Sequence, residues 1–362
     1  MRSRRWALPA VKVAVVLGAA VVVALLPRFM GEYRLSQFTY VAIYFIALLG
    51  LNILTGYNGQ ISLGHGAFIG VGAYTSALLI LGRPGLQDLN IDPPSWLPLG
   101  DGMRPVLTIP IAAAVTGIVG FAFGFPALRL PGVSLALATL GIAVSLPSIA
   151  KRFETVTGGG GGLNIPLPKT PFGLDVPAPH WLYYEAWVTA GVLFLVAWLL
   201  VRGRIGRAWR AIRDGEVAAA SSGVSPAAYK TLAFGTSSAF AGAAGALFAI
   251  QVSYVNPDTF PLNLSILLLA SVVVGGLSSL TGVIFGALLM EFLPIYAQQV
   301  SIPWVLSSSK QAPSVVFGAV LILCMLLLPA GAAGFLHRVL RPLRRALAGE
   351  TRLLRARGAP PG

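Results

Sequence analysis

Apolar residues fill long, nearly continuous runs along this chain, separated by short polar or glycine-rich segments. A full membrane crossing by an α-helix needs about 20 such residues. Most of the runs reach that length, but the run at 264–277 is too short unless it tilts, breaks or re-enters. The pattern predicts an all-α polytopic membrane protein with about ten transmembrane or half-membrane helices, at 11–27, 35–55, 61–82, 105–125, 131–150, 184–201, 231–250, 264–277, 282–298 and 312–328.

The polar segments between the runs predict the orientation of the chain. Most of the 26 lysine and arginine residues fall in alternate segments, which the positive-inside rule assigns to the cytoplasm. Both chain ends are therefore predicted to be cytoplasmic. The predicted organisation is an N-terminal basic segment with the first helix (1–34), a transmembrane domain (35–335) and a basic cytoplasmic tail (336–362).

Composition makes the bilayer the only suitable solvent. The chain is 56% hydrophobic and 10% charged, whereas soluble domains carry about 25% charged residues. The isoelectric point of about 10.5 is explained by basic helix ends that face anionic lipid headgroups, and no nucleic-acid motif is present. The basic, apolar N-terminus resembles a signal peptide, but no A-x-A-like cleavage site follows it, so we interpret it as a retained helix.

Motifs of enzymes and metal sites are missing from the sequence. The five-glycine run at 158–162 is followed by Leu163 and Asn164, and not by the Lys-Ser/Thr of a nucleotide-binding loop. The three histidines fall in different predicted compartments and cannot share one metal. We therefore expect no metal, no cofactor bound by this chain and no catalysis of its own. A protein that moves a solute fits better.

The segment LTGYNGQISLGHGAFIGVGAY (54–74) places poor helix formers between two apolar runs. Glycine costs a helix about 1 kcal/mol relative to alanine. The segment is either a close-packed helix or a broken helix that lines a transport pathway. The packing interpretation applies to Gly64, Gly66, Gly70 and Gly72. A weak similarity between 59–73 and 276–289 also fits an internal structural repeat.

Several polar residues are candidates for the pathway. We interpret His65 as a structural, hydrogen-bonded histidine in preference to a proton carrier, and we leave open whether Glu291 pairs, snorkels or gates. The glycine run is predicted to lie outside, either as a plain turn or as a loop beside the substrate mouth. The pathway candidates are Gln60, Ser62, His65, Thr139, Thr157, Gly158 and Gly159.

The predicted cytoplasmic loop 202–230 carries five arginines, the acidic residues Asp214 and Glu216, and an alanine-rich turn. Gly223 is suited to end that turn and Pro226 to begin the next helix. The loop is far longer than the usual connection of about 2–8 residues between packed helices. It is either a solvated basic loop or a short helix that inserts into a groove of a soluble partner.

This loop resembles the EAA-type coupling loop in permeases of branched-chain amino acid ABC importers. Five other stretches match patterns of the same family in the same order, from about residue 48 to 335. They are GYNGQISLGHGAFIGVGAY, PALRLPGVSLALATL, TVTGGGGGLNIP, VVVGGLSSLTGVIFGALL and PAGAAGF.

The resemblance implies an M-type permease subunit of the bacterial cytoplasmic (inner) membrane. It implies a homologous H-type permease, two cytoplasmic ATPase subunits that use ATP and Mg, and an extracytoplasmic substrate-binding protein as partners. The residues implied in ATPase coupling are Arg210, Asp214, Glu216, Ala218, Ala219 and Gly223.

Departures from the family pattern leave the substrate open. Val217 separates Glu216 from the two alanines, so the glutamate lies one residue early relative to the general permease pattern. Ala143, Val144 and Ser145 stand where a glutamate is common, and Val133 replaces an aromatic residue. The alternatives are a permease of the same family for urea or short amides, or a stand-alone solute channel.

Overall fold

The computed structural model describes residues 23–127, 132–167 and 177–299, with scattered residues in 18–22 and 318–334. The predicted helices at 11–27 and 312–328 lie largely outside the described residues, as do the basic tail 336–362 and both chain ends. The orientation predicted for those ends therefore stays a prediction.

The described part of the chain is mostly helical and contains almost no strand, which confirms the all-α polytopic class. Seven of its helices are long and apolar enough to cross a membrane, and α12 is a shorter apolar helix; the predicted total of ten stays a prediction. The elements are η1 (Leu26–Arg28), α2 (Glu32–Leu51), η2 (Asn52–Tyr57), α3 (His65–Asp88), α4 (Pro105–Ala127), α5 (Val133–Arg152), α6 (Glu154–Thr157), η3 (Gly159–Gly161), β1 (Leu163–Asn164), α7 (Ala178–Arg202), α8 (Arg204–Asp214), α9 (Glu216–Ser221), α10 (Pro226–Val252), β2 (Tyr254–Val255), η5 (Pro257–Thr259), α11 (Leu262–Gly275) and α12 (Val283–Gln299).

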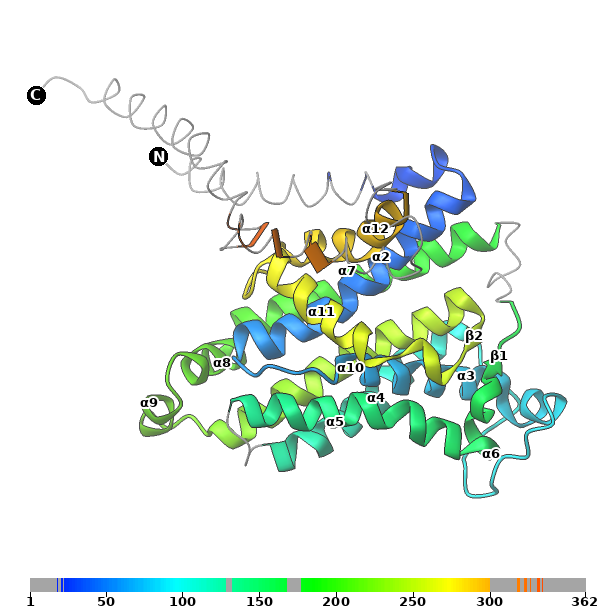
Figure 1. Cartoon of the computed structure of the whole chain (residues 1–362), viewed down its shortest axis with the longest axis horizontal. Coiled ribbons are helices and arrows are strands. Elements are labelled where there is room, and N and C mark those ends of the chain that lie inside the picture. Colours follow the sequence, from blue (N-terminus) through cyan, green and yellow to red (C-terminus); the bar gives the residue numbers. More distant parts are fainter. Residues whose placement is uncertain are drawn as a thin grey trace, which may run out of the picture.

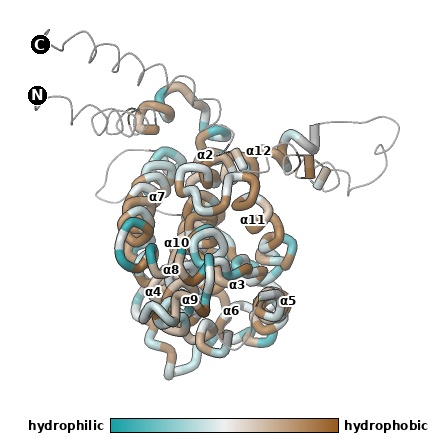
Figure 2. The backbone as a smooth tube through the Cα atoms, turned by 90° about the vertical axis from the view of Figure 1, so that its left-hand side faces the viewer, coloured by the Kyte–Doolittle hydropathy of each residue, from teal (hydrophilic) through white to brown (hydrophobic). Residues whose placement is uncertain are grey.

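Helix α10 lies at the centre of the bundle and packs against α4, α3 and α2. Helices α7 and α12 lie on the other side of α2 (Figure 1). Viewed from the end that carries α8 and α9, the long helices surround α10 (Figure 2). The apolar parts of α2, α3 and α10 are mostly buried, whereas α4, α5 and α7 expose large apolar side chains such as Ile118, Leu137 and Val188. Such faces suit lipid or an apolar partner.

Small residues allow α3 and α10 to approach closely. A Cβ on Gly72 would lie 2.3 Å from the carbonyl oxygen of Gly242, and a Cβ on Gly245 would lie 2.0 Å from that of Ile69. No side chain fits at either position without moving a backbone. These contacts are an example of the small-residue helix packing that is common in membranes.

Two helices are interrupted within the bundle. Helix α2 continues into one turn of π-helix, η2, after which residues 58–64 have no regular secondary structure and α3 begins only at His65. The predicted helix at 61–82 thus starts four residues late. Gly59, which lies between η2 and α3, has a φ of +77° that does not permit a continuous helix from one to the other. The short predicted helix at 264–277 is α11, which forms a hairpin with α12 through residues 276–282.

The two ends of the bundle carry different structures (Figure 1). Helices α8 and α9 project at one end. At the opposite end, α6, η3 and η5 surround a small antiparallel pair, in which Leu163 faces Val255 and Asn164 faces Tyr254. The loop 202–230 and the glycine run 158–162, predicted to lie on opposite membrane sides, are therefore at opposite ends of the molecule.

Candidate coupling loop and translocation pathway

Helix α8 is fixed to the membrane bundle by its apolar face. Trp209 is fully buried, and its indole Nε1 donates a hydrogen bond to the Tyr229 carbonyl oxygen at 2.9 Å. Gly206 lies against the backbone of Val201, where a Cβ would meet the carbonyl oxygen at 2.0 Å. The opposite face exposes Arg204 and Arg207. A displacement of α8 must therefore move the ends of α7 and α10 as well.

Helix α9 is a short hairpin tip between α8 and α10. The Lys230 Nζ lies 2.5 Å from the Glu216 Oε2, which ties the start of α9 to α10. Gly223, with a φ of +84°, ends the turn, and the Val224 amide donates to the Ala219 carbonyl oxygen. Glu216, which lies one residue early relative to the general permease pattern, is therefore paired with Lys230.

The coupling candidates divide by exposure. Asp214, Glu216, Ala218 and Gly223 are exposed and Arg210 is half-buried, whereas Ala219 is turned inward with 4% of its surface exposed. Sequence reasoning treated Val217 only as an intervening residue, yet it is 82% exposed at the tip. A helix of six residues is too short for its periodicity to reveal which face points outward.

The polar side chains of the irregular segment 58–64 form hydrogen bonds within the segment and with the turn before it. The Gln60 side-chain oxygen Oε1 accepts a hydrogen bond from the Asn58 side-chain amide at 2.7 Å. The Thr55 hydroxyl donates to the Gln60 backbone carbonyl oxygen at 3.0 Å. The Ser62 hydroxyl accepts from the Gly64 amide at 3.3 Å. Non-helical backbone at membrane depth needs such partners. Ile61, in contrast, points outward with 46% of its surface exposed.

Two buried side chains connect the start of α3 to its neighbours. A ring nitrogen of His65, Nε2, lies 2.9 Å from the Ala47 carbonyl oxygen in α2. The Thr139 hydroxyl of α5 accepts a hydrogen bond from the Leu63 amide at 2.9 Å. Gln60, Ser62, His65 and Thr139 are thus gathered around one interrupted helix.

The glycines predicted to pack do lie against other elements. A Cβ on Gly64 would be 2.8 Å from the Thr139 carbonyl oxygen, and one on Gly66 would be 2.8 Å from the Ser265 hydroxyl. The Gly66 amide donates to that hydroxyl at 2.9 Å. Gly70 faces Leu146 and Phe260. The start of α3 is therefore enclosed by α5 and α11.

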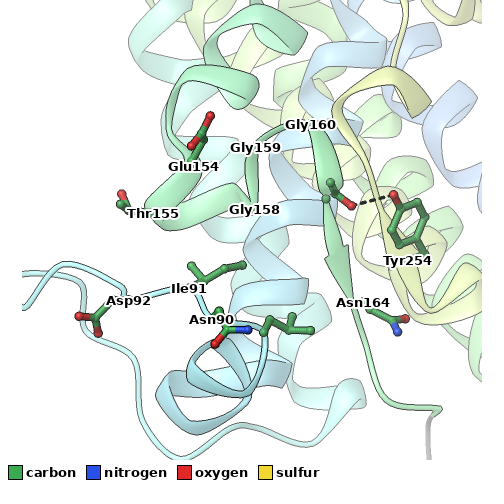
Figure 3. A pocket seen from close by; sticks show the side chains of 13 residues that line it. Asn90, Ile91, Asp92, Glu154, Thr155, Gly158, Gly159, Gly160, Asn164 and Tyr254 are labelled. Atoms are coloured by element: carbon green, nitrogen blue, oxygen red, sulfur yellow. Dashed lines mark hydrogen bonds between the residues drawn. The ribbon is translucent and has the colours of Figure 1, made fainter.

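A cavity of about 670 Å³ opens at the far end of the bundle (Figure 3). Its lining is mixed: apolar side chains come from Leu89 and Ile91, and polar groups from the residues Asp92, Glu154, Asn90 and Asn164 and from the glycine run 158–162. Such a set can hold a small zwitterionic or polar solute by hydrogen bonds.

The glycine run at this cavity is held in place by contacts with β2 (Tyr254–Val255). The Tyr254 hydroxyl donates to the Gly161 carbonyl oxygen at 2.8 Å (Figure 3). Gly162, with a φ of +69°, comes so close to β2 that a Cβ would lie 2.4 Å from the Val255 carbonyl oxygen. Glycine is needed here for both conformation and space.

The seven pathway candidates therefore form two separate groups. Gln60, Ser62, His65 and Thr139 lie around the start of α3, whereas the other three lie at the cavity end. Of those three, Gly158 and Gly159 line the cavity. The Thr157 hydroxyl instead donates to carbonyl oxygens of its own chain segment, those of Ala150 and Phe153.

Glu185 and Glu291 are acidic residues in the interior of apolar helices, away from the helix ends. Glu185 of α7 is 7% exposed, and neither carboxylate oxygen has a hydrogen-bond partner among the described residues. The predicted apolar run 184–201 begins one residue before Glu185, whereas α7 begins at Ala178, so Glu185 lies about two turns inside the helix. Glu291 lies on α12, partly buried, with no ion pair inside the described ranges. In the part of the chain that the structure describes, no three His, Cys, Asp or Glu side chains gather as metal ligands.

Comparisons with known proteins agree with this arrangement. A family model described as "Branched-chain amino acid transport system / permease component" matches residues 33–325. No solved structure matches this chain.

Curated relatives give the same result. The "High-affinity branched-chain amino acid transport system permease protein LivM" of Escherichia coli K12 is 35% identical over 316 residues, which cover 79% of this chain and 70% of that protein. The LivM protein of Salmonella typhimurium LT2 is 36% identical over 77% of this chain and 67% of its own length. The "Autoinducer 2 import system permease protein LsrC" of Escherichia coli O9:H4 is 25% identical, over 75% of this chain and 74% of that protein. The chain belongs to the family of branched-chain amino acid transport system permeases of ABC importers.

Proposed function

We propose that this chain is the M-type permease subunit of an importer for branched-chain amino acids, driven by partner ATPases that dock on α8 and α9. The observation that supports the substrate assignment is the similarity to two LivM proteins at 35% and 36% identity. The docking site is supported by a projecting loop that is anchored to the bundle and exposes Val217 and Ala218.

The remaining subunits follow from this role. A permease whose sequence lacks a nucleotide-binding motif needs ATPase subunits that use ATP and Mg on the cytoplasmic side. We expect two of them, together with an H-type permease and a substrate-binding protein that delivers to the cavity end. The setting is the bacterial cytoplasmic membrane, with lipid against the apolar faces of α4, α5 and α7.

The alternatives are less well supported. No relative reported above is described as a carrier of urea or short amides, and the relative described as an autoinducer 2 importer is only 25% identical. A stand-alone channel would leave the anchored coupling loop without a use.

Uptake by cells tests the proposal. The chain would be co-expressed with its neighbouring transporter genes in a strain without its own leucine uptake, and entry of labelled leucine measured. We expect uptake that isoleucine and valine compete for, and that is lost when the partner ATPases cannot hydrolyse ATP. Competition by urea or acetamide alone, or uptake that survives without ATP hydrolysis, would refute it.

A further inference from the structure

Arg213, the penultimate residue of α8, reaches across to two other segments of the chain. Its Nη1 donates hydrogen bonds to the Gly56 carbonyl oxygen at 3.0 Å and to the Ser278 hydroxyl at 2.6 Å. Its Nε and Nη2 donate to a single oxygen of Asp214, at 3.0 and 2.9 Å. The neighbouring carboxylate thus orients the guanidinium, whose remaining edge joins residues far away in the sequence.

The two segments that Arg213 joins are also bonded to each other. The Ser278 hydroxyl donates to the Gly56 carbonyl oxygen at 2.7 Å. The buried Asn52 accepts from the Ser278 amide at 2.9 Å and donates to the Ser279 carbonyl oxygen at 3.1 Å. Ser278 has a φ of 62°, unusual for a residue with a side chain, and these bonds hold it there. We name the set Asn52, Gly56, Arg213 and Ser278 the arginine junction.

Both segments lead directly into the interrupted helices. Gly56 is the penultimate residue of the π-helical turn η2, and the irregular residues 58–64 lead from this turn to the start of α3. Ser278 lies in the turn that joins α11 to α12. Gly59 completes the contact, because a Cβ there would lie 2.8 Å from the Cγ of Arg213. Single π-helical turns inside α-helices often mark functional sites.

We propose that Arg213 is the positioning residue that transmits movement of the coupling loop to the two interrupted helices, through its bonds to Gly56 and Ser278. The inference rests on the proposed function, because the movement originates in the partner ATPases. When α8 rotates or withdraws, the Gly56 and Ser278 backbones move jointly with it, since one guanidinium is bonded to both segments. The same movement shifts the irregular segment 58–64 and the α11–α12 hairpin.

A simpler alternative is that Arg213 serves only as a cytoplasmic positive charge. The Arg213→Lys variant distinguishes a role as a positive charge from a role that depends on the guanidinium geometry. It keeps the charge, but its single ammonium on a flexible stem does not reproduce a planar group that spans Asp214, Gly56 and Ser278. Arg207 provides the matched control, since it is an exposed arginine on the same helix with no ion pair or side-chain hydrogen bond within the described ranges.

The test uses the complete transporter in proteoliposomes, with its ATPases and binding protein. Leucine transported and ATP hydrolysed are measured in parallel for wild type, Arg213→Ala, Arg213→Lys, Ser278→Ala and Arg207→Ala. We expect both Arg213 variants to assemble and hydrolyse ATP, with leucine moved per ATP lowered about tenfold, since charged hydrogen bonds of this kind are lost. Ser278→Ala should be lowered in the same direction. Arg207→Ala removes a charge from the exposed face of α8, where the ATPases are proposed to dock, so it can lower ATP hydrolysis, but the leucine moved per ATP should equal that of wild type.

The outcomes separate this inference from the function beneath it. If wild type itself moves no leucine while it hydrolyses ATP, the substrate assignment fails. If wild type works and Arg213→Lys restores full coupling, the residue is only a charge and the junction is refuted. Equal loss of ATP hydrolysis and transport in the Arg213 variants would also refute it, because the defect would then lie in docking or folding.

Discussion

Gly72 of α3 and Gly242 of α10 meet with no side chain between them. Two helix backbones at this distance exclude lipid and water along the contact, and they gain dispersion energy from many atom pairs. The same geometry recurs at Gly245 against Ile69. The glycines that weaken α3 as an isolated helix thus stabilise it inside the bundle, because only they allow the central helix to come so close.

Gly72→Ala should destabilise the protein. The added Cβ would lie 2.3 Å from the Gly242 carbonyl oxygen, so the helices must separate, at a cost of about 1–3 kcal/mol for overpacking. A lower melting temperature of the purified protein in detergent would show this. Gly141→Ala in α5 is the control, because its Cβ meets nothing within 4 Å. Equal melting temperatures for the two variants would contradict the packing account.

At the scale of elements, the α8–α9 hairpin separates an anchored part from a presented part. Trp209 and the Lys230–Glu216 ion pair fasten it to α10. The tip, in contrast, offers an apolar side chain to water at Val217. An isolated exposed valine is common, but one held at the tip of a rigid projection is suited to fill a groove on a partner.

Val217→Asp should weaken association with the ATPase subunits, because burial of an unpaired carboxylate in an apolar groove is costly. Co-purification of the ATPases with the tagged permease measures the effect, and we expect a loss of at least about tenfold. Leu167→Asp is the matched control, an aliphatic residue of similar exposure, 78%, at the opposite end of the molecule. Undiminished co-purification of Val217→Asp would exclude Val217 from the docking surface.

Sequence patterns located the elements better than they located the site. Hydropathy predicted the apolar runs, because helix length and lipid thickness are linked, whereas the density of glycine left a close-packed helix and a broken helix both open at 54–74. The arginine junction was not predictable, since Asn52 and Ser278 bond across 226 residues of sequence with no local signal. The inward turn of Ala219 and the buried position of Glu185 likewise depend on tertiary packing, which hydropathy does not resolve.

At the scale of the whole molecule, the coupling loop and the polar cavity occupy opposite ends of one helical bundle (Figure 1). The interrupted helices lie between them, connected to the coupling loop by Arg213. This order suits a transporter in which substrate arrives at one end and ATP-driven force at the other. The apolar outer faces of α4, α5 and α7 place the bundle in lipid.

Cysteine labelling tests this orientation. In a Cys324→Ser background, a cysteine at Ser221 in α9 should react with a membrane-impermeant maleimide only after the cells are opened. A cysteine at Gly160, which lines the exposed cavity, should react in intact cells. Labelling of both positions from the same side would contradict the two-ended arrangement.

The most direct measurement of the central claim is leucine transport by the purified, complete transporter in proteoliposomes, with ATP supplied only on the side of α8 and α9. The account predicts leucine movement that requires both ATP hydrolysis and the binding protein, that valine and isoleucine compete for, and that stops with Val217→Asp. Leucine movement without ATP, or an assembled complex that hydrolyses ATP and moves no branched-chain amino acid, would contradict it.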